Sequence, residues 1–261
     1  MEVKSDYTWT SKVKRKNNPL LPSNIRGLII GKSNCGKTTL LINFLLQPDW
    51  LDYTNLYVFG KSLHQREYQI LRKGFESGLS KQQLTNIFQN KDKIKDDDDP
   101  IKLIDEYIQQ GGEAKGDINS AFFDICTQIP DPRELNEHEK NLLILDDCLL
   151  EKQNKAEAYY TRGRHNNCDT FYISQNYFRL PRQTIRENAN FIILFPQDNK
   201  NIAHIYADHC SNDMEIDEFK RLCYHVWEAA PHNFVTIDLT STKFNGKYRQ
   251  NLETFYFPIS V

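Results

Sequence analysis

The sequence predicts an α/β domain built on a mostly parallel β-sheet that is flanked by helices. Short, almost wholly apolar runs at residues 28–30, 141–146 and 191–195 are typical of strands that are buried on both faces, as in a parallel sheet. The first run leads directly into a loop with two glycines and then into a mostly apolar helix at about residues 39–46. A strand, a loop and a helix in this order begin a βαβ arrangement.

The loop after the first strand carries the most specific motif of the chain. Residues 31–38 read GKSNCGKT and match the phosphate-loop pattern G-x-x-x-x-G-K-[ST]. Gly31 and Gly36 would let the backbone wrap around an anion, Lys37 would reach the β- and γ-phosphates, and the Thr38 hydroxyl would ligate Mg²⁺. We therefore predict that ATP and Mg²⁺ are the ligands, and that nine residues hold the nucleotide: Gly31, Lys32, Ser33, Asn34, Cys35, Gly36, Lys37, Thr38 and Thr39.

A second motif, this one acidic, lies at the end of the apolar run at residues 141–146. The run ends in Asp146-Asp147, as in a Walker B strand, and would bring both carboxylates to the edge of the sheet beside the phosphate loop. Asp146 would hold Mg²⁺. Asp147 would polarise the water that attacks the γ-phosphate, which is the task of a general base and favours hydrolysis over transfer to an acceptor. Two adjacent acids also occur in plain turns, but the phosphate loop favours the catalytic interpretation.

The next strand, at residues 170–174, ends in Ser174-Gln175 and places an amide at the same edge of the sheet. Gln175 would sense the γ-phosphate or orient water. Arg162 and Arg164, between this strand and the preceding one, are candidates for a finger that enters a neighbouring subunit's site, with a solvated helix end as the alternative. Residues 161–190 contain five arginines and are where we expect contacts with a phosphate backbone, although a solvated surface explains them equally well.

The remaining pattern predicts further elements and the limits of the domain. Strands are expected at residues 55–60, 234–239 and 255–257, and a helix through residues 216–226 with Asp213 as a candidate N-cap. We expect a basic N-terminal arm over residues 1–20 and one domain over residues 21–261. Residues 61–138 form a charged insertion, with short helices beside a solvated loop that holds the run KDKIKDDDDP at residues 91–100.

Composition restricts the compartment and the partners expected for the protein. The 261 residues carry a formal net charge of -2, so contact with nucleic acid must come from a local patch. The six cysteines are scattered without C-x-x-C pairs, which indicates a reducing compartment. The apolar runs are far shorter than the roughly 20 residues that a bilayer span needs, and no apolar segment follows Met1. We therefore expect an intracellular protein without a membrane partner.

Several segments together resemble one known family. GKSNCGKTTL, LLILDD, TRGRHNN, the strand that runs into SQNYF, and RLPRQTIRENAN follow one another in the order and approximate spacing of the viral genome-packaging ATPases of the FtsK-HerA superfamily. The resemblance is to the poxvirus-type enzymes and their relatives in virophages and Maverick/Polinton transposons. It covers about residues 24 to 200, and the insertion at 61–138 matches nothing in it.

The resemblance implies a fold and a function. It implies a P-loop NTPase of the additional-strand catalytic Glu/Asp type, with a central sheet in the order 5-1-4-3-2, to which the extra C-terminal strands are added. It also implies a ring, commonly hexameric, that drives double-stranded DNA into a preformed capsid, with capsid or portal-vertex proteins as partners. Assembly would take place in the host cytoplasm or nucleus, with the virion as a second location. Asp147 stands where the wider superfamily commonly has glutamate.

The family's residue roles are carried over onto matching positions. Lys37 and Thr38 would bind phosphate and Mg²⁺, Asp146 would be the Mg²⁺ carboxylate, Asp147 the catalytic acid and Gln175 the sensor. Arg164 is the first candidate for the trans finger, followed by Arg162 and Arg186.

Two other functions remain open from the residues alone. The first is a P-loop kinase of a small acceptor, which would have no use for a trans finger. The second is a nucleotide-dependent binding switch of the GTPase kind. Guanine recognition by an N-K-x-D motif is missing, because Asn90-Lys91-Asp92 lacks the intervening residue, and ATP is therefore preferred to GTP.

Overall fold

A computed structural model describes residues 16–89, 100–109, 116 and 118–257. The strands are β1 (Arg26–Ile30), β2 (Asn55–Gly60), β3 (Asn119–Phe123), β4 (Asn141–Asp146), β5 (Cys168–Ser174), β6 (Phe191–Leu194), β7 (Val235–Asp238), β8 (Tyr248–Gln250) and β9 (Thr254–Tyr256). The helices are α1 (Lys37–Leu46), α2 (Arg66–Glu76), α3 (Lys81–Gln89), α4 (Pro100–Gln109), α5 (Asn154–Arg162), α6 (Asn199–His209) and α7 (Ile216–Ala229).

The strands form one sheet in the order β3-β2-β4-β5-β1-β6-β7-β8-β9. All pairs from β3 to β6 are parallel, and β7 to β9 are added antiparallel to them. Strand β5 lies between the phosphate-loop strand β1 and the acidic strand β4. The predicted order 5-1-4-3-2 is confirmed for the central strands, where it is the run β6-β1-β5-β4-β2, and it differs in detail because β3 is added beyond β2. The predicted α/β class with extra C-terminal strands is confirmed as well.

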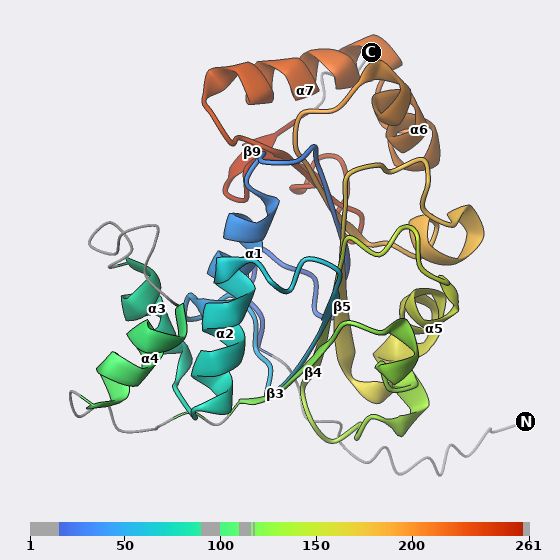
Figure 1. Cartoon of the computed structure of the whole chain (residues 1–261). Helices are drawn as coiled ribbons and strands as arrows, with labels where there is room; N and C mark the ends of the chain where they lie inside the picture. The colour runs from blue at the N-terminus through green and yellow to red at the C-terminus, as the bar shows by residue number, and fades with distance from the viewer. Residues whose placement is uncertain (1–15, 90–99, 110–115, 117, 258–261) are drawn as a thin grey trace, which may run out of the picture.

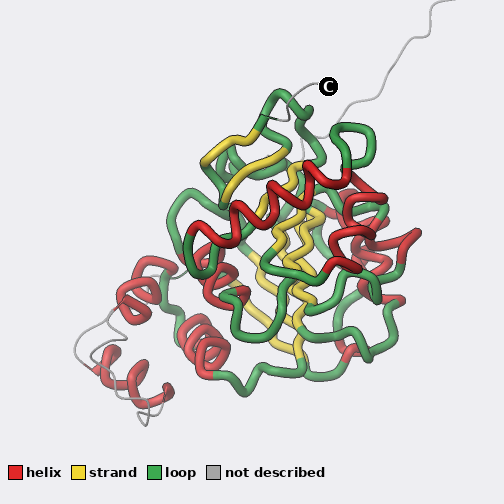
Figure 2. The backbone as a smooth tube through the Cα atoms, turned by 90° about the horizontal axis from the view of Figure 1, so that it is seen from above, coloured by secondary structure: helices red, strands yellow, loops and turns green. Residues whose placement is uncertain are grey.

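Helices cover both faces of the sheet, and each face has its own hydrophobic core (Figure 1). Successive residues of a strand point to opposite faces, so that Leu143 and Leu145 join one core while Leu142 and Ile144 join the other. One core includes residues of α5, α6 and α7, and the other includes residues of α1 to α4. Seen from above, the strands lie between the two sets of helices (Figure 2). A strand that is apolar on both sides is the physical basis of this three-layer arrangement.

The insertion at residues 61–138 contains more regular structure than the sequence predicts. Helix α2 buries Tyr68, Leu71 and Phe75 on one face, as expected, and α3 and α4 stand at the margin of the molecule in both views (Figures 1 and 2). Strand β3 pairs with β2 in parallel and extends the sheet at its edge, which the sequence analysis did not foresee. It has only five residues and is half-exposed, so its apolar signal is weak. The acidic run at residues 96–99 lies outside the described residues.

The C-terminal region corrects one local prediction. Helix α7 begins after Glu215, not after Asp213, and buries Phe219 and Leu222 at the expected spacing. Asp213 instead accepts hydrogen bonds from the Lys247 ammonium and from the Tyr248 hydroxyl, the latter at 2.7 Å. A partly buried carboxylate gains more from two such donors than from an exposed helix terminus.

The N-terminal arm is described from residue 16 onward, and its basic residues 12–15 lie outside the described residues. Asn17 donates to Asp169 at 2.9 Å and accepts from the backbone N–H of Asp52, also at 2.9 Å. The end of the predicted arm is therefore packed against the domain. In the part of the chain that the structure describes, no helix combines the length and apolar character needed to cross a membrane.

Candidate nucleotide site

The candidate site lies at the carboxyl edge of the sheet, where four parallel strands end level with one another. Ile30 at the end of β1 pairs with Ser174 of β5, and Ile173 of β5 pairs with Asp146 of β4. Gly60 at the end of β2 pairs in turn with Asp146. The residues that follow these strands therefore meet above one edge of the sheet, which is where open α/β sheets bind ligands.

The phosphate loop needs its two glycines for different reasons. Gly36 precedes α1 with φ 106°, a left-handed conformation that strains any residue with a Cβ. Gly31 is closely surrounded: a Cβ there would lie 2.7 Å from the Cβ of Phe195 and closer still to the sulfur of Cys35. The loop can therefore turn sharply from β1 into α1, with the backbone N–H groups of the helix N-terminus directed at the space above.

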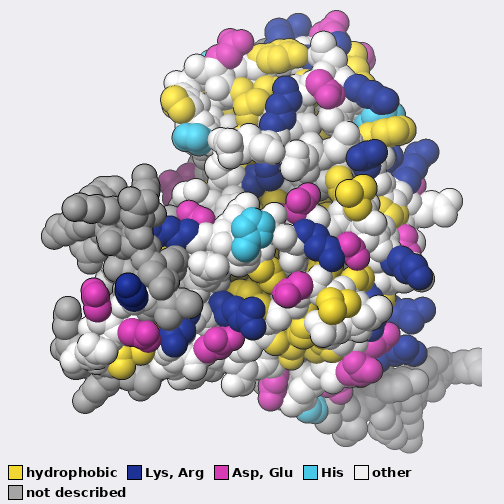
Figure 3. All heavy atoms as spheres, viewed as in Figure 1, with side chains coloured by type: hydrophobic (Ala, Val, Ile, Leu, Met, Phe, Trp, Pro, Cys, Tyr) yellow, Lys and Arg dark blue, Asp and Glu magenta, His cyan; other side chains and the backbone are white. Residues whose placement is uncertain are grey.

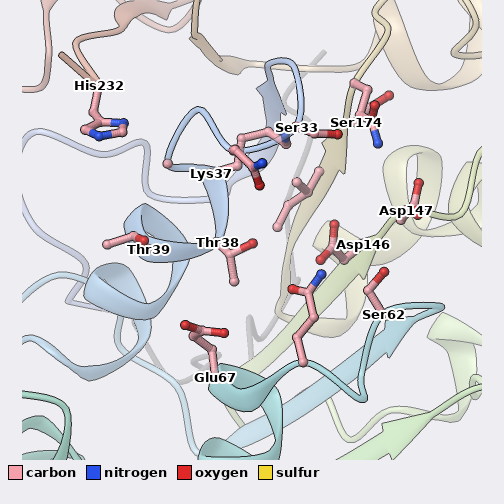
Figure 4. A pocket seen from close by; sticks show the side chains of 15 residues that line it. Ser33, Lys37, Thr38, Thr39, Ser62, Glu67, Asp146, Asp147, Ser174 and His232 are labelled. Atoms are coloured by element: carbon pink, nitrogen blue, oxygen red, sulfur yellow. The ribbon is translucent and has the colours of Figure 1, made fainter. Parts of the chain in front are cut away.

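Lys37 is held at the mouth of the loop by the loop's own backbone. Its ammonium donates to the carbonyls of Gly31 at 2.7 Å and Lys32 at 2.6 Å. In Figure 4 the Lys37 and Thr38 side chains both face the cavity. The cation and the hydroxyl that the motif requires thus lie side by side at the start of α1.

The loop borders a cavity of about 700 Å³, which lies within the usual range for ligand clefts, roughly 300 to 1,000 Å³. Asp146, Asp147 and Gln175 line the side of the cavity that faces the loop. Six of the nine predicted nucleotide-binding residues line it: Ser33, Asn34, Gly36, Lys37, Thr38 and Thr39. The other three, Gly31, Lys32 and Cys35, shape the loop and present carbonyl oxygens to Lys37 or His232.

Asp146 is the buried member of the acidic pair. It is 8% exposed, and its carboxylate accepts a hydrogen bond of 2.6 Å from the hydroxyl of Tyr68, which is on α2. Burial raises the pKa of Asp146, the Tyr68 hydrogen bond lowers it, and the neighbouring Asp147 raises it further, with a net increase. The same burial, together with Asp146, raises the pKa of Tyr68 well above its usual value, which keeps the phenol protonated as the donor.

Asp147 and Gln175, unlike Asp146, are exposed at the cavity. Asp147 leaves the strand direction with φ 51°, which an aspartate tolerates better than most residues. Gln175 follows β5 directly and is exposed as well. Both line the cavity that the phosphate loop borders. The insertion of β5 between β1 and β4 therefore brings the amide and the two carboxylates to the loop.

The residues fit a magnesium ion. The Thr38 hydroxyl and the Asp146 carboxylate are both oxygen donors on the same cavity, and Mg²⁺ prefers a few such ligands together with water and phosphate oxygens. Asp146 is buried with a raised pKa, and a bound cation would favour its charged form. Figure 4 shows the two side chains facing each other across the cavity.

Comparison with known proteins relates this geometry to solved structures. No family model matches the chain, and no curated protein matches it. The genome packaging NTPase B204 from Sulfolobus turreted icosahedral virus 2, in complex with AMPPCP, has a TM-score of 0.52 at 12% identity, covering 88% of this chain and 98% of that chain. Its complex with sulfate also gives 0.52 at 12% identity, covering 91% and 100%. The chain has the fold of this genome packaging NTPase.

The packaging-NTPase fold leaves the predicted arginines away from the cavity of their own chain. Helix α5 leads from the acidic strand back toward the start of β5, so Arg162 and Arg164 lie near the opposite edge of the sheet, and both are exposed. Burial lowers the pKa of Arg26, at the start of β1, and the charge of Arg164 lowers it further, which places these two arginines near each other. Neither Arg162 nor Arg164 lines the nucleotide cavity.

Arg186, the third candidate for the finger, is engaged within its own chain. It is 4% exposed, and its guanidinium forms an ion pair of 2.8 Å with Asp208 and lies over the ring of Tyr177 at 4.9 Å. Removing it from this pair would leave a buried charge without a partner, which costs several kcal/mol, about 3 to 5. Arg186 therefore has a structural role in this fold. Its prediction as a finger candidate was wrong.

Several residues that line the cavity were missed by the sequence analysis. Ser62, Gln65 and Glu67 follow β2, and Figure 4 shows the carboxylate of Glu67 directed toward Thr38. The expected position of β2 beside the acidic strand was a usable signal for them, because the ends of neighbouring parallel strands meet. His232 comes from the segment before β7, and no local pattern connects it with the loop.

Proposed function

We propose that the protein is an ATP-hydrolysing motor that moves double-stranded DNA into a viral or virus-like capsid. The observation that carries this proposal is the single cavity in which the phosphate loop, Asp146, Asp147 and Gln175 meet. The packaging NTPase B204, whose fold the chain shares, has been solved with AMPPCP and with ATP-gammaS. B204 is a genome packaging NTPase, and this, together with the family resemblance of the sequence, supports genome packaging among the P-loop activities.

We assign each residue a task in the proposed reaction from its place in the cavity. Lys37 would exchange its two backbone acceptors for oxygens of the β- and γ-phosphates. Thr38 and Asp146 would hold Mg²⁺, which supplies charge neutralisation at the phosphates when bound. A carboxylate oxygen of Asp147 would accept a proton from the attacking water, and the Gln175 amide would orient that water. Asp147 is suited to this task because it is exposed to the cavity, whereas Asp146 is buried against Tyr68.

Contact with DNA is proposed for the flank that carries the arginines of residues 161–190. Arg162, Arg164, Arg179 and Arg182 are exposed, and Lys and Arg side chains appear along the edge of the molecule that α5 and α6 form (Figure 3). The charge of Arg182 is partly compensated by an ion pair of 3.3 Å with Glu187. The chain as a whole is slightly acidic, so a local surface of this kind is where phosphates would bind.

A ring of subunits, commonly a hexamer in the family that the sequence resembles, is part of the proposal, with capsid or portal-vertex proteins as further partners. Arg162, at the end of α5, and Arg164, just after it, are exposed and do not line the cavity of their own chain, which suits a residue that acts on the next subunit. In such a ring the edge that carries Arg164 would face the carboxyl edge of the neighbouring sheet.

Steady-state ATP hydrolysis with and without long double-stranded DNA, measured at low and at moderate salt, tests the proposal. We expect DNA to stimulate hydrolysis and the stimulation to weaken as salt rises, because counterions compete with the protein's cations for phosphates. Hydrolysis that is indifferent to DNA at every salt concentration would contradict a DNA motor and favour a kinase or a binding switch.

A further inference from the structure

A second, smaller cavity adjoins the phosphate loop on the side away from the catalytic acids. Its volume is about 280 Å³, and Gly36, Thr39 and His232 line both it and the larger cavity, so the two adjoin. The remaining lining is largely apolar and includes Phe195 and Phe234. We call this smaller cavity the aromatic cleft.

The direction of a bound nucleotide follows from the chemistry of the larger cavity. Lys37, Thr38 and Asp146 suit the β- and γ-phosphates and their metal ion, so the rest of the nucleotide must leave in the opposite direction. Figure 4 shows His232 and Thr39 on one side of Lys37, with Asp146 and Asp147 on the other. The aromatic cleft thus begins where the sugar and base would emerge from the phosphate loop.

The walls of the aromatic cleft are suited to a flat aromatic ring. The rings of Phe195 and Phe234 lie 5.2 Å apart between centroids at an angle of 52°, and both are buried. The imidazole of His232 adds a further ring, and Asn43 on α1 adds an exposed amide that can both donate and accept hydrogen bonds. Stacking on such rings favours any nucleobase, whereas an amide can distinguish its edge.

His232 is held in an unusual conformation at this position. Its φ of 63° lies in the left-handed region, which histidine adopts more readily than most residues but still at a cost. Its Nδ1 lies 3.1 Å from the carbonyl oxygen of Cys35, within the phosphate loop. A strained residue that contacts the loop and borders two adjoining cavities points to a role in ligand binding.

We propose that the aromatic cleft binds the base of the nucleotide, with His232 as one wall and Phe234 as another. The inference rests on the proposed nucleotide binding and adds to it the place of the base. It also makes the segment between α7 and β7, outside the phosphate-loop motif, part of the nucleotide site. The recognition of the base would then depend on residues almost 200 positions from the loop in the sequence.

Equilibrium binding of ATP and of inorganic triphosphate to the full chain tests this assignment. Inorganic triphosphate has the phosphates but no base, so the wild-type protein should bind ATP more tightly. The variant His232→Asn keeps a residue that tolerates the left-handed backbone but removes the ring. It should lose about tenfold or more of its affinity for ATP, as expected for a lost stacking partner, and bind inorganic triphosphate as the wild type does. The variant Phe234→Leu should show the same pattern.

The matched control is His225→Asn, which makes the same change at an exposed histidine of α7 and should alter neither affinity. Unchanged ATP affinity in both cleft variants would overturn the assignment of the base. So would an equal loss for ATP and inorganic triphosphate, because His232 would then act on the phosphate loop alone. A wild-type protein that binds neither compound would overturn the proposed function itself, and the base cleft with it.

Discussion

At the scale of single residues, the two adjacent acids of the site have unlike surroundings, and their proposed tasks follow from this difference. Asp146 is buried and held by the Tyr68 hydroxyl, so its carboxylate has a fixed position that suits a metal ligand. Asp147 is exposed and turned out of the strand by its positive φ, so it can approach a water molecule in the cavity. Two neighbouring positions in the sequence thus provide a buried carboxylate, suited to the proposed metal ligand, and an exposed one, suited to the proposed base.

The variant Asp147→Asn tests whether Asp147 acts as the general base. We expect nucleotide binding to persist and turnover to fall by about 10² to 10⁴, because the amide cannot accept the proton of the attacking water. Nucleotide binding and steady-state hydrolysis, measured on the same preparation, separate the two effects.

Two further variants serve as the inactive reference and the unchanged control for that test. Lys37→Ala should abolish hydrolysis, since it removes the cation that binds the β- and γ-phosphates. Asp124→Asn changes an exposed aspartate that does not line the cavity and should leave turnover unchanged. Undiminished turnover in Asp147→Asn would refute the role assigned to this carboxylate.

The residues that could be predicted from the sequence are those whose partners are close in the chain. Lys37 and Thr38 belong to one short motif, and Asp146 with Asp147 ends one apolar run. His232 could not be predicted, because only the fold brings it to the loop. Arg186 was misjudged for a related reason, since its partner Asp208 lies on a different element, α6.

At the scale of elements, the position of β5 decides how the site is assembled. The strands β1 and β4 do not pair with each other, and β5 pairs with both. Its last residue, Ser174, therefore lies between the phosphate loop and the acids, and Gln175 follows at the cavity. The apolar runs of the sequence predicted these strands, whereas their order came from the family resemblance, because a buried strand carries no local signal for its neighbours.

The strands that the sequence did not predict are short or at an edge. Strand β8 has three residues, and β3 has five, of which Asn119 and Ser120 are polar. Strands of this kind lack both a long apolar run and a clear alternation, which are the signals on which strand prediction depends. The pairing of β3 with β2 is set by tertiary contact and not by local preference.

At the scale of the whole molecule, the cavity lies at one edge of the sheet, and Arg162 and Arg164 lie at the opposite edge. Subunits mixed from two inactive variants test whether these edges meet between neighbours. We expect Arg164→Ala to be nearly inactive, since an arginine finger contributes roughly 10³ to 10⁵ in rate. Mixing it with Lys37→Ala should restore some hydrolysis, because a Lys37→Ala subunit supplies Arg164 to a neighbour with an intact loop.

The control for this mixing experiment is Arg72→Ala, an exposed arginine of α2 that pairs with Glu76 and should leave hydrolysis unchanged. If hydrolysis does not recover at any mixing ratio, the site is not shared through Arg164. If Arg164→Ala alone is fully active, the finger role is refuted without mixing.

The proposed motor requires that hydrolysis at this cavity moves double-stranded DNA. Displacement of a third strand from a linear duplex measures such movement directly, because a translocating protein removes the strand that blocks its path. We predict that the wild-type protein displaces the strand with ATP, and that neither ATP-gammaS with the wild type nor ATP with Lys37→Ala supports displacement. DNA-stimulated hydrolysis without any displacement would contradict the motor and leave a DNA-dependent ATPase switch in its place.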